Sequence, residues 1–507
     1  MTMTKPSTGQ LYATRTRRGR YVACQVVCVD AEHAEIVALD WIGEEPPRSG
    51  ELERARPLVL NHHAWMGELK RIMVEPDVPE GFELVGEAPL VVSPHPPSNA
   101  YSSWNAIPLQ VEAQHQWDHE LSDEVREAYH QAKSRRGEDV ELDLGAGGVH
   151  TVPVDAWRLW IGAASSTRWQ LLVPEDAAIR WEALEALGAL TEVEYFGRDA
   201  GFAPWVSSRR LISRVFWHKH GQTRIDLSTS ALEEFGCGAE DEALELVLPE
   251  GLRSLHVNDV ANASSLRVVH PHEGDGLHLS VRSQELWAAP RGLSRLSVLS
   301  MSGLRRADCA ILVGYPELRE LELEGAPGEL CAPDALLRLR ELRALSLRDF
   351  YAGELAALPA ASAWPRLQRL EVRGLRATDA ALLRKRLKGI PQLEIAGAKS
   401  DARIRENLEN PFRDWVDERP ALGKAACAAW KKARVALRKL GSDATRAQIE
   451  PVLVVFIEAF NRLERKHGLD TIRREEVCDA YDGLCLDVQS AIDEASANEL
   501  LDRLREF

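Results

Sequence analysis

The stretch ELRELEL at 317–323 is one of seven copies of a single pattern that recurs between about residues 250 and 400. In most copies the order is an apolar residue, two variable residues, a leucine, one variable residue and a second apolar residue. The other copies are GLRSLHV (251–257), EGDGLHL (273–279), RLSVLSM (295–301), ELRALSL (341–347), RLQRLEV (366–372) and GIPQLEI (389–395). The key leucines recur every 22 to 25 residues, which predicts stacked coils that each contribute one short strand to a continuous core.

This pattern resembles that of the bacterial leucine-rich repeat (LRR) proteins, over roughly a third of the chain. The resemblance implies an LRR solenoid whose concave sheet recognises a protein or another ligand, and it implies no catalysis. The family usually carries an asparagine five residues after the second leucine, whereas this chain has Leu304, Ala326 and Phe350 at three of these positions. We therefore expect coils that turn less regularly than those of the family.

The regions on either side of the repeats differ from them in composition, since ten of the 14 tryptophans lie between Trp41 and Trp217. Residues 9–28 predict a β-hairpin with its turn at Arg18-Gly19, and residues 430–504 have the apolar spacing of helices. We predict an α/β LRR solenoid, preceded by β-rich and α+β domains and followed by an α-helical bundle. The predicted segments are a small barrel-like β-rich domain (1–116), a Trp-rich α+β domain or N-terminal cap (117–240), the solenoid of about seven repeats (241–400), and a capping segment with a helical domain (401–507).

The register of the copies also predicts which side chains lie on the exposed face of the strands. Side chains alternate between the two faces of a strand, so the residues between and beside the buried leucines face outward. The predicted partner-binding residues are Glu320, Glu322, Glu324, Arg348, Arg369, Glu371 and Arg373. A mixed polar strip of this kind suits a charged protein partner. A sheet face that is merely solvated is the alternative interpretation.

The candidate chemistry in the chain is sparse. VELDLGAGGV (140–149) resembles the first motif of Rossmann-type methyltransferases. The chain continues as VHTVPV (149–154), which opens no helix, so a β-turn is favoured. The pairs His218 and His220, and His270 and His272, have no Cys or Glu at a spacing diagnostic of a zinc site. We therefore predict no catalytic residues, no cofactor and no metal.

Charge and hydropathy limit the environment and the partners. The formal net charge of −16 argues against a general nucleic-acid binder, and no apolar run is long enough to cross a membrane. The eight cysteines are scattered without a CxxC motif, which is typical of reduced thiols. We expect a cytoplasmic protein with protein partners, and neither nucleic acid nor a membrane.

The predicted function is that of a non-enzymatic adaptor, scaffold or regulator that recognises a protein through its repeats. Its combination of repeats with unlike terminal segments suggests, by analogy of architecture, a bacterial conflict, defence or stress-signalling system. One alternative is an enzyme or ligand-binding protein with its site in the Trp-rich region 117–240. Another is an immunity-type inhibitor, because residues 9–28 weakly resemble the start of a bacterial toxin-immunity family.

Overall fold

The chain divides into two compact units. The computed structural model describes residues 5–16, 18–63, 65, 67–79, 81–94, 101–163, 169–238, 243–258, 265–441, 444–486, 488 and 492–507. The first unit comprises Met1–Val257, Ser265–His278 and Arg291–Leu293. The second comprises Asn258–Ser264, Leu279–Pro290 and Ser294–Phe507. The division of the chain into four segments stays a prediction.

The first unit begins with an antiparallel five-stranded sheet in the order β6-β3-β2-β1-β7. Its strands are β1 (Gln10–Arg15), β2 (Tyr21–Val29), β3 (Ala34–Gly43), β6 (Arg71–Val74) and β7 (Phe82–Glu87). The expected hairpin is confirmed, because β1 pairs with β2 and Gly19 in the turn has a φ of 86°. Helix α2 (Ala106–His119) covers this sheet, and its Ile107 and Val111 share a buried core with Tyr12 and Trp104.

The first unit also contains several shorter elements. They are α1 (Ser49–Leu52), β4 (Val59–Leu60), β5 (Glu68–Leu69), α3 (Asp123–Ser134), β8 (Asp139–Asp143), β9 (Val149–Pro153), η1 (Trp181–Ala186), α4 (Phe202–Ser208) and a three-stranded parallel sheet of β14 (Arg224–Asp226), β16 (Leu244–Val247) and β18 (Leu266–Val269). Strands β8 and β9 form a hairpin around Gly145 and Gly148, which both have positive φ. The β-turn interpretation of VELDLGAGGV is therefore confirmed.

The large sheet of the protein has twelve strands in the order β11-β10-β12-β13-β15-β17-β19-β20-β21-β22-β23-β24, and the pairings described between them are all parallel. Its strands are β10 (Arg158–Gly162), β11 (Gln170–Leu172), β12 (Glu192–Phe196), β13 (Arg214–His218), β15 (Glu234–Gly238), β17 (Ser254–Asn258), β19 (His278–Arg282), β20 (Val298–Asp308), β21 (Glu320–Cys331), β22 (Ala344–Gly353), β23 (Arg369–Arg376) and β24 (Gln392–Lys399).

The predicted fold class, an LRR solenoid preceded by β-rich and α+β domains and followed by a helical bundle, is wrong. The chain has an α/β-type fold with one large sheet, and this sheet begins inside the region 117–240, for which we expected an α+β domain or an N-terminal cap. The strands of that region have the same alternating burial as the later ones, but their buried positions hold Val193, Val215 and Phe235. Because these positions lack the regular leucines, the repeat pattern did not reveal that the strands share one sheet.

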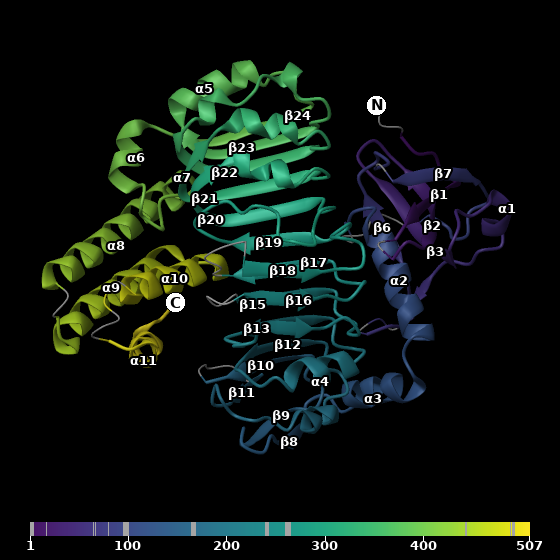
Figure 1. Ribbon diagram of the computed structural model, residues 1–507, viewed down its shortest axis with the longest axis horizontal. Helices are drawn as coiled ribbons and strands as arrows, with labels where there is room; N and C mark the ends of the chain where they lie inside the picture. Colours follow the sequence, from purple (N-terminus) through teal and green to yellow (C-terminus); the bar gives the residue numbers. More distant parts are fainter. Residues whose placement is uncertain are drawn as a thin grey trace. The chain divides into compact units, whose positions relative to one another are not determined.

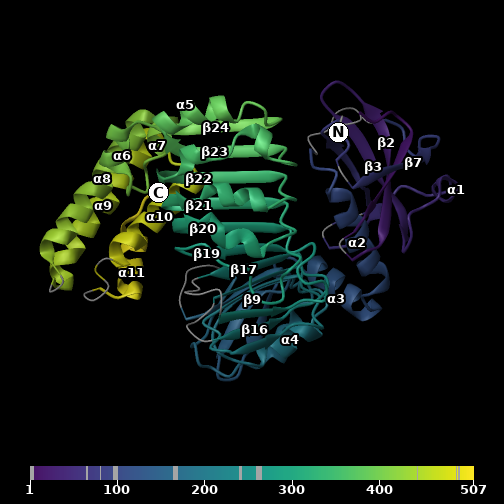
Figure 2. The same cartoon turned by 45° about the horizontal axis from the view of Figure 1, so that its top comes forward.

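In the second unit, the key leucines of β20 to β24 lie side by side. The paired positions run from Leu299 through Leu321, Leu345 and Leu370 to Leu393. The first four of these leucines are at most 2% exposed. Figures 1 and 2 show β20 to β24 as successive neighbouring arrows. The strands return through η3 (Cys309–Gly314), η4 (Pro333–Arg338), η5 (Leu355–Ala357), η6 (Ala361–Ala363) and α5 (Ala377–Arg386).

The second unit ends in helices with an aromatic core. They are α6 (Asp401–Asn407), α7 (Trp415–Glu418), α8 (Pro420–Leu440), α9 (Arg446–His467), α10 (Thr471–Leu486) and α11 (Glu494–Leu504). Helix α9 begins with a capping box of Thr445 and Gln448, and α8 and α9 end at Gly441 and Gly468, both with positive φ. No helix among the described residues is long and apolar enough to cross a membrane.

Candidate functional site

The seven predicted partner-binding residues lie on three neighbouring strands, β21, β22 and β23. The register places them in three rows, which are Glu320–Ala344–Arg369, Glu322–Ser346–Glu371 and Glu324–Arg348–Arg373. Each residue is exposed or half-buried, whereas the leucines that alternate with these rows are buried. The structure therefore brings the predicted residues together on the face of the sheet opposite the leucine core.

Ion pairs connect the charged residues across the strands. The Arg348 guanidinium lies between two carboxylates, with Nη1 3.2 Å from Oε1 of Glu322 and Nη2 3.3 Å from Oε1 of Glu371. Arg373 lies between the next two, with Nε 2.7 Å from Oε1 of Glu371 and Nη2 2.7 Å from Oε1 of Glu394. We call the five residues Glu322, Arg348, Glu371, Arg373 and Glu394 the charge ladder.

The charge ladder is accessible to solvent. The side chains of Glu322, Arg348, Arg373 and Glu394 are between 40% and 54% exposed, and that of Glu371 is 20% exposed. Our sequence-based set of partner-binding residues did not include Glu394. Glu394 lies between Leu393 and Ile395 in the last copy, and this outward-facing position could have identified it as a further partner-binding residue.

A second group of charges lies beside the ladder and ties it to the segment before α7. Asp349 follows Arg348 with a φ of 59°, and its carboxylate accepts a hydrogen bond of 2.8 Å from the Tyr351 hydroxyl and pairs with Arg413. Lys399 at the end of β24 pairs with Asp414 and is 4% exposed. Burial and the neighbouring Asp349 carboxylate raise the pKa of Tyr351, so this phenol stays protonated and donates its hydrogen bond.

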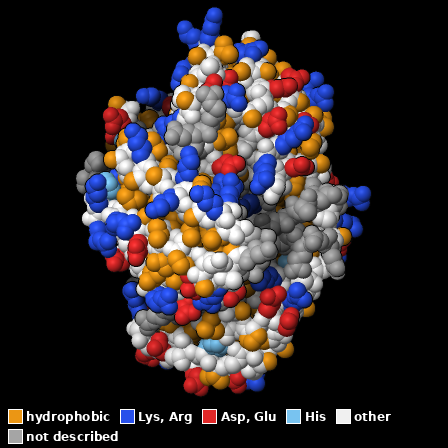
Figure 3. All heavy atoms as spheres, turned by 90° about the vertical axis from the view of Figure 1, so that its left-hand side faces the viewer, with side chains coloured by type: hydrophobic (Ala, Val, Ile, Leu, Met, Phe, Trp, Pro, Cys, Tyr) orange, Lys and Arg blue, Asp and Glu red, His pale blue; other side chains and the backbone are white. Residues whose placement is uncertain are grey.

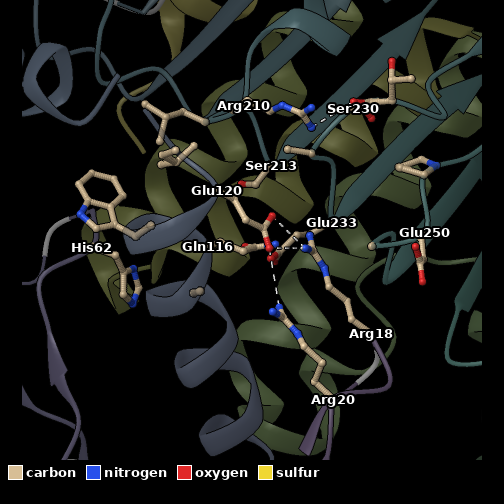
Figure 4. A pocket seen from close by; sticks show the side chains of 18 of the residues that line it. Arg18, Arg20, His62, Gln116, Glu120, Arg210, Ser213, Ser230, Glu233 and Glu250 are labelled. Carbon is tan, nitrogen blue, oxygen red and sulfur yellow. Dashed lines mark hydrogen bonds and ion pairs between the residues drawn. The ribbon is translucent and has the colours of Figure 1, made fainter. Parts of the chain in front are cut away.

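The first unit contains a cavity of about 750 Å³ (Figure 4). Arg18 and Arg20 from the β1–β2 hairpin point toward Glu120 after α2, at 3.2 and 3.7 Å. The Glu112 carboxylate is 2% exposed and lies 3.7 Å from both Arg20 and Arg253. The cavity is further lined by Arg210 and by the hydroxyl-bearing residues Ser228, Thr229 and Ser230.

Two histidines on another part of the cavity wall are held in their neutral form. His62 and His63 place their Nδ1 atoms 2.9 Å apart, and His63 packs against the rings of Trp117 and Tyr129. Burial and the adjacent His62 lower the pKa of His63 to about 4. Burial also lowers the pKa of His62, so neither imidazole supplies positive charge to the cavity near neutral pH.

Both His-x-His pairs make local contacts, and in the second pair His272 lies 3.2 Å from the Glu250 carboxylate and His270 accepts a hydrogen bond from the backbone N–H of Gly274. His218 pairs with Glu194 at 3.3 Å, and His220 lies 2.7 Å from the carbonyl oxygen of Gly238. In the part of the chain that the structure describes, no group of three or more His, Cys, Asp and Glu side chains could hold a metal ion. Trp181, Trp205 and Trp217 pack with Tyr195 and Phe202 in the core of the first unit.

No protein-family model matches the chain, and no curated protein matches it. The resemblances to bacterial LRR proteins and to a toxin-immunity family therefore stay predictions, and the function must be inferred from the surfaces of the two units.

Proposed function

We propose that this protein is a non-enzymatic adaptor or regulator that recognises a protein partner through the exposed face of β21 to β24. The observation that carries the proposal is the charge ladder, in which five charged side chains alternate in sign across four neighbouring strands. Strands lie about 4.8 Å apart, so the ladder spans roughly 14 Å of sheet. Glu320, Glu324 and Arg369 extend it on both sides.

The energetics of the ladder support a role in recognition more than in folding. Ion pairs between exposed side chains contribute only about 0–1 kcal/mol each, so this arrangement adds little to the stability of the sheet. For the same reason, a partner that offers Lys, Arg, Asp or Glu at matching positions can exchange these pairs for its own at small cost. Complementary charges of this kind determine the register and the association rate of a complex.

The proposal predicts that reversing two charges of the charge ladder greatly weakens binding of the partner. In Glu322→Arg/Arg373→Glu, Arg348 faces a new cation, and Glu371 and Glu394 face a new anion, so a complementary surface meets like charges. We expect the amount of partner captured from a lysate of the source cell to fall by about tenfold or more. Capture by immobilised wild-type and variant protein, quantified by mass spectrometry, measures this change.

The matched control reverses an ion pair elsewhere in the same unit. Arg366 pairs with Glu341, and both side chains are at least a third exposed. Glu341→Arg/Arg366→Glu leaves the net charge unchanged, as the ladder variant does, so we expect it to retain the partner. If the ladder variant and the control capture the same proteins in the same amounts, the face of β21 to β24 is not the recognition surface.

The cavity of the first unit supports ligand binding as a second candidate function. Its volume of about 750 Å³ lies within the range of small-molecule sites, and its lining of arginines and hydroxyls suits a polar molecule. We expect non-denaturing mass spectrometry of the purified protein to detect one bound molecule that is lost in Arg210→Glu. If the wild-type protein shows only the mass of the chain without a bound molecule, this candidate function is excluded.

A further inference from the structure

Helix α8 carries six cations and no acidic residue, in a chain whose formal net charge is −16. The cations are Lys424, Lys431, Lys432, Arg434, Arg438 and Lys439. Arg434 pairs with Glu409 at 2.6 Å and lies over the ring of Trp430. The other five side chains are exposed, and within the described residues none of the four lysines forms an ion pair.

The outer face of α8 is hollowed, and its floor is apolar. Two adjoining depressions of about 560 and 440 Å³ share Ala428 and Lys431. Val435, which is 46% exposed, and Ala436 continue the floor toward the end of the helix. The opposite face of α8 is buried through residues such as Ala433 and Leu437. Figure 3, which shows the side of Figure 1 where α8 and α9 lie, mixes basic and hydrophobic side chains.

We propose that this groove docks an acidic amphipathic helix of a partner protein. The inference goes beyond the recognition role of the charge ladder, because it gives the second unit another protein-binding surface with a different charge. Lys424, Lys431 and Arg438 are seven residues apart, so they form one stripe on the helix surface. From Lys424 to Arg438 the stripe is about 21 Å long, which matches about four turns of a partner helix.

The chemistry of the floor favours a helix over the other polyanions. Small side chains such as Ala428 and Ala436 allow a second helix to approach closely, and Val435 offers it an apolar contact. A membrane-binding helix would present large apolar side chains, whereas the apolar residues that line the two depressions are small or medium-sized: three alanines, Cys427, Val416 and Val435. A nucleic acid would gain nothing from the apolar floor, and the negative charge of the rest of the chain would repel it.

The test uses full-length protein and a fluorescein-labelled 16-residue peptide with one leucine stripe flanked by glutamates. A peptide of the same composition in scrambled order is the reference. We expect fluorescence anisotropy to show binding of the helical peptide at least about tenfold tighter than that of the scrambled one. The affinity should fall by about tenfold or more in Lys431→Glu/Lys432→Glu. It should be unchanged in Lys385→Glu/Lys388→Glu, which reverses two exposed lysines of the same unit.

Val435→Arg separates a helix from other polyanions, because it adds a cation and removes the apolar floor. We expect this variant to bind the helical peptide more weakly. We expect it to bind heparin or phosphatidylserine vesicles, if they bind at all, as tightly as wild type or more tightly. The proposal is overturned if the scrambled peptide binds as tightly as the helical one, or if Val435→Arg leaves peptide binding intact. Heparin or vesicles that bind through Lys431 and Lys432 while the peptide does not would also overturn it. Thermal melts check that every variant is folded.

Discussion

Replacing Arg413 by methionine should lower the free energy of unfolding of the second unit by about 3 kcal/mol. The Arg413 side chain is 15% exposed and pairs with Asp349, which is 18% exposed, and with Asp414 at 3.7 Å. Methionine fills similar space but leaves the Asp349 carboxylate with the Tyr351 hydroxyl as its remaining described side-chain partner. An unpaired charge that is largely buried is costly, which makes this one of the two largest effects that we expect.

Urea denaturation followed by tryptophan fluorescence and circular dichroism measures the loss. Arg366→Met is the control, because its pair with Glu341 is exposed and should contribute less than about 1 kcal/mol. Adding Asp349→Asn to Arg413→Met removes the stranded charge, and we expect it to recover part of the lost stability. Equal effects of Arg413→Met and Arg366→Met would contradict this account of how the C-terminal helices are attached to the strands.

Leu345→Ala should destabilise the second unit by about 2–5 kcal/mol, because it opens a cavity in the centre of the leucine column. Leu345 is 1% exposed and lies in register between Leu321 and Leu370. The hydroxyl of its chain neighbour Ser346 lies on the opposite face and has no hydrogen-bond partner among the described residues. Ser346→Ala therefore breaks no bond and should change stability by less than about 0.5 kcal/mol. The same denaturation experiment compares the two. A similar loss in both variants would mean that the two faces of β22 do not differ as described.

The regular leucines made part of the sheet predictable. The register of β20 to β24 follows from the fixed spacing, because each leucine that enters the core fixes the outward direction of its neighbours. The register predicted for the copy at 273–279 was less accurate. Its key leucine, Leu277, lies one residue before β19, and the buried residues within β19 are Leu279 and Val281. Where two leucines alternate with a polar residue, the sequence alone permits a shift of two positions.

The contacts that depend on the tertiary fold could not be predicted. Arg18 and Glu120 are 102 residues apart, and Arg413 and Asp349 are 64 apart, so no local pattern links either pair. The continuation of the large sheet into residues 158–238 was missed because valines and aromatic residues fill its core there. For the candidate site, the charges on β21 to β23 were predictable from strand alternation, whereas their pairing into a ladder required the structure.

Zero-length cross-linking with a carbodiimide tests the central claim most directly, because it joins a carboxylate only to an amine that touches it. The measurement is made on the captured complex of the full-length protein, and mass spectrometry locates the linked residues. We predict links from partner lysines to Glu320, Glu322 and Glu324, lost in Glu322→Arg/Arg373→Glu and kept in Glu341→Arg/Arg366→Glu. Links confined to carboxylates away from β21 to β24, unchanged in the ladder variant, would contradict the proposed recognition surface.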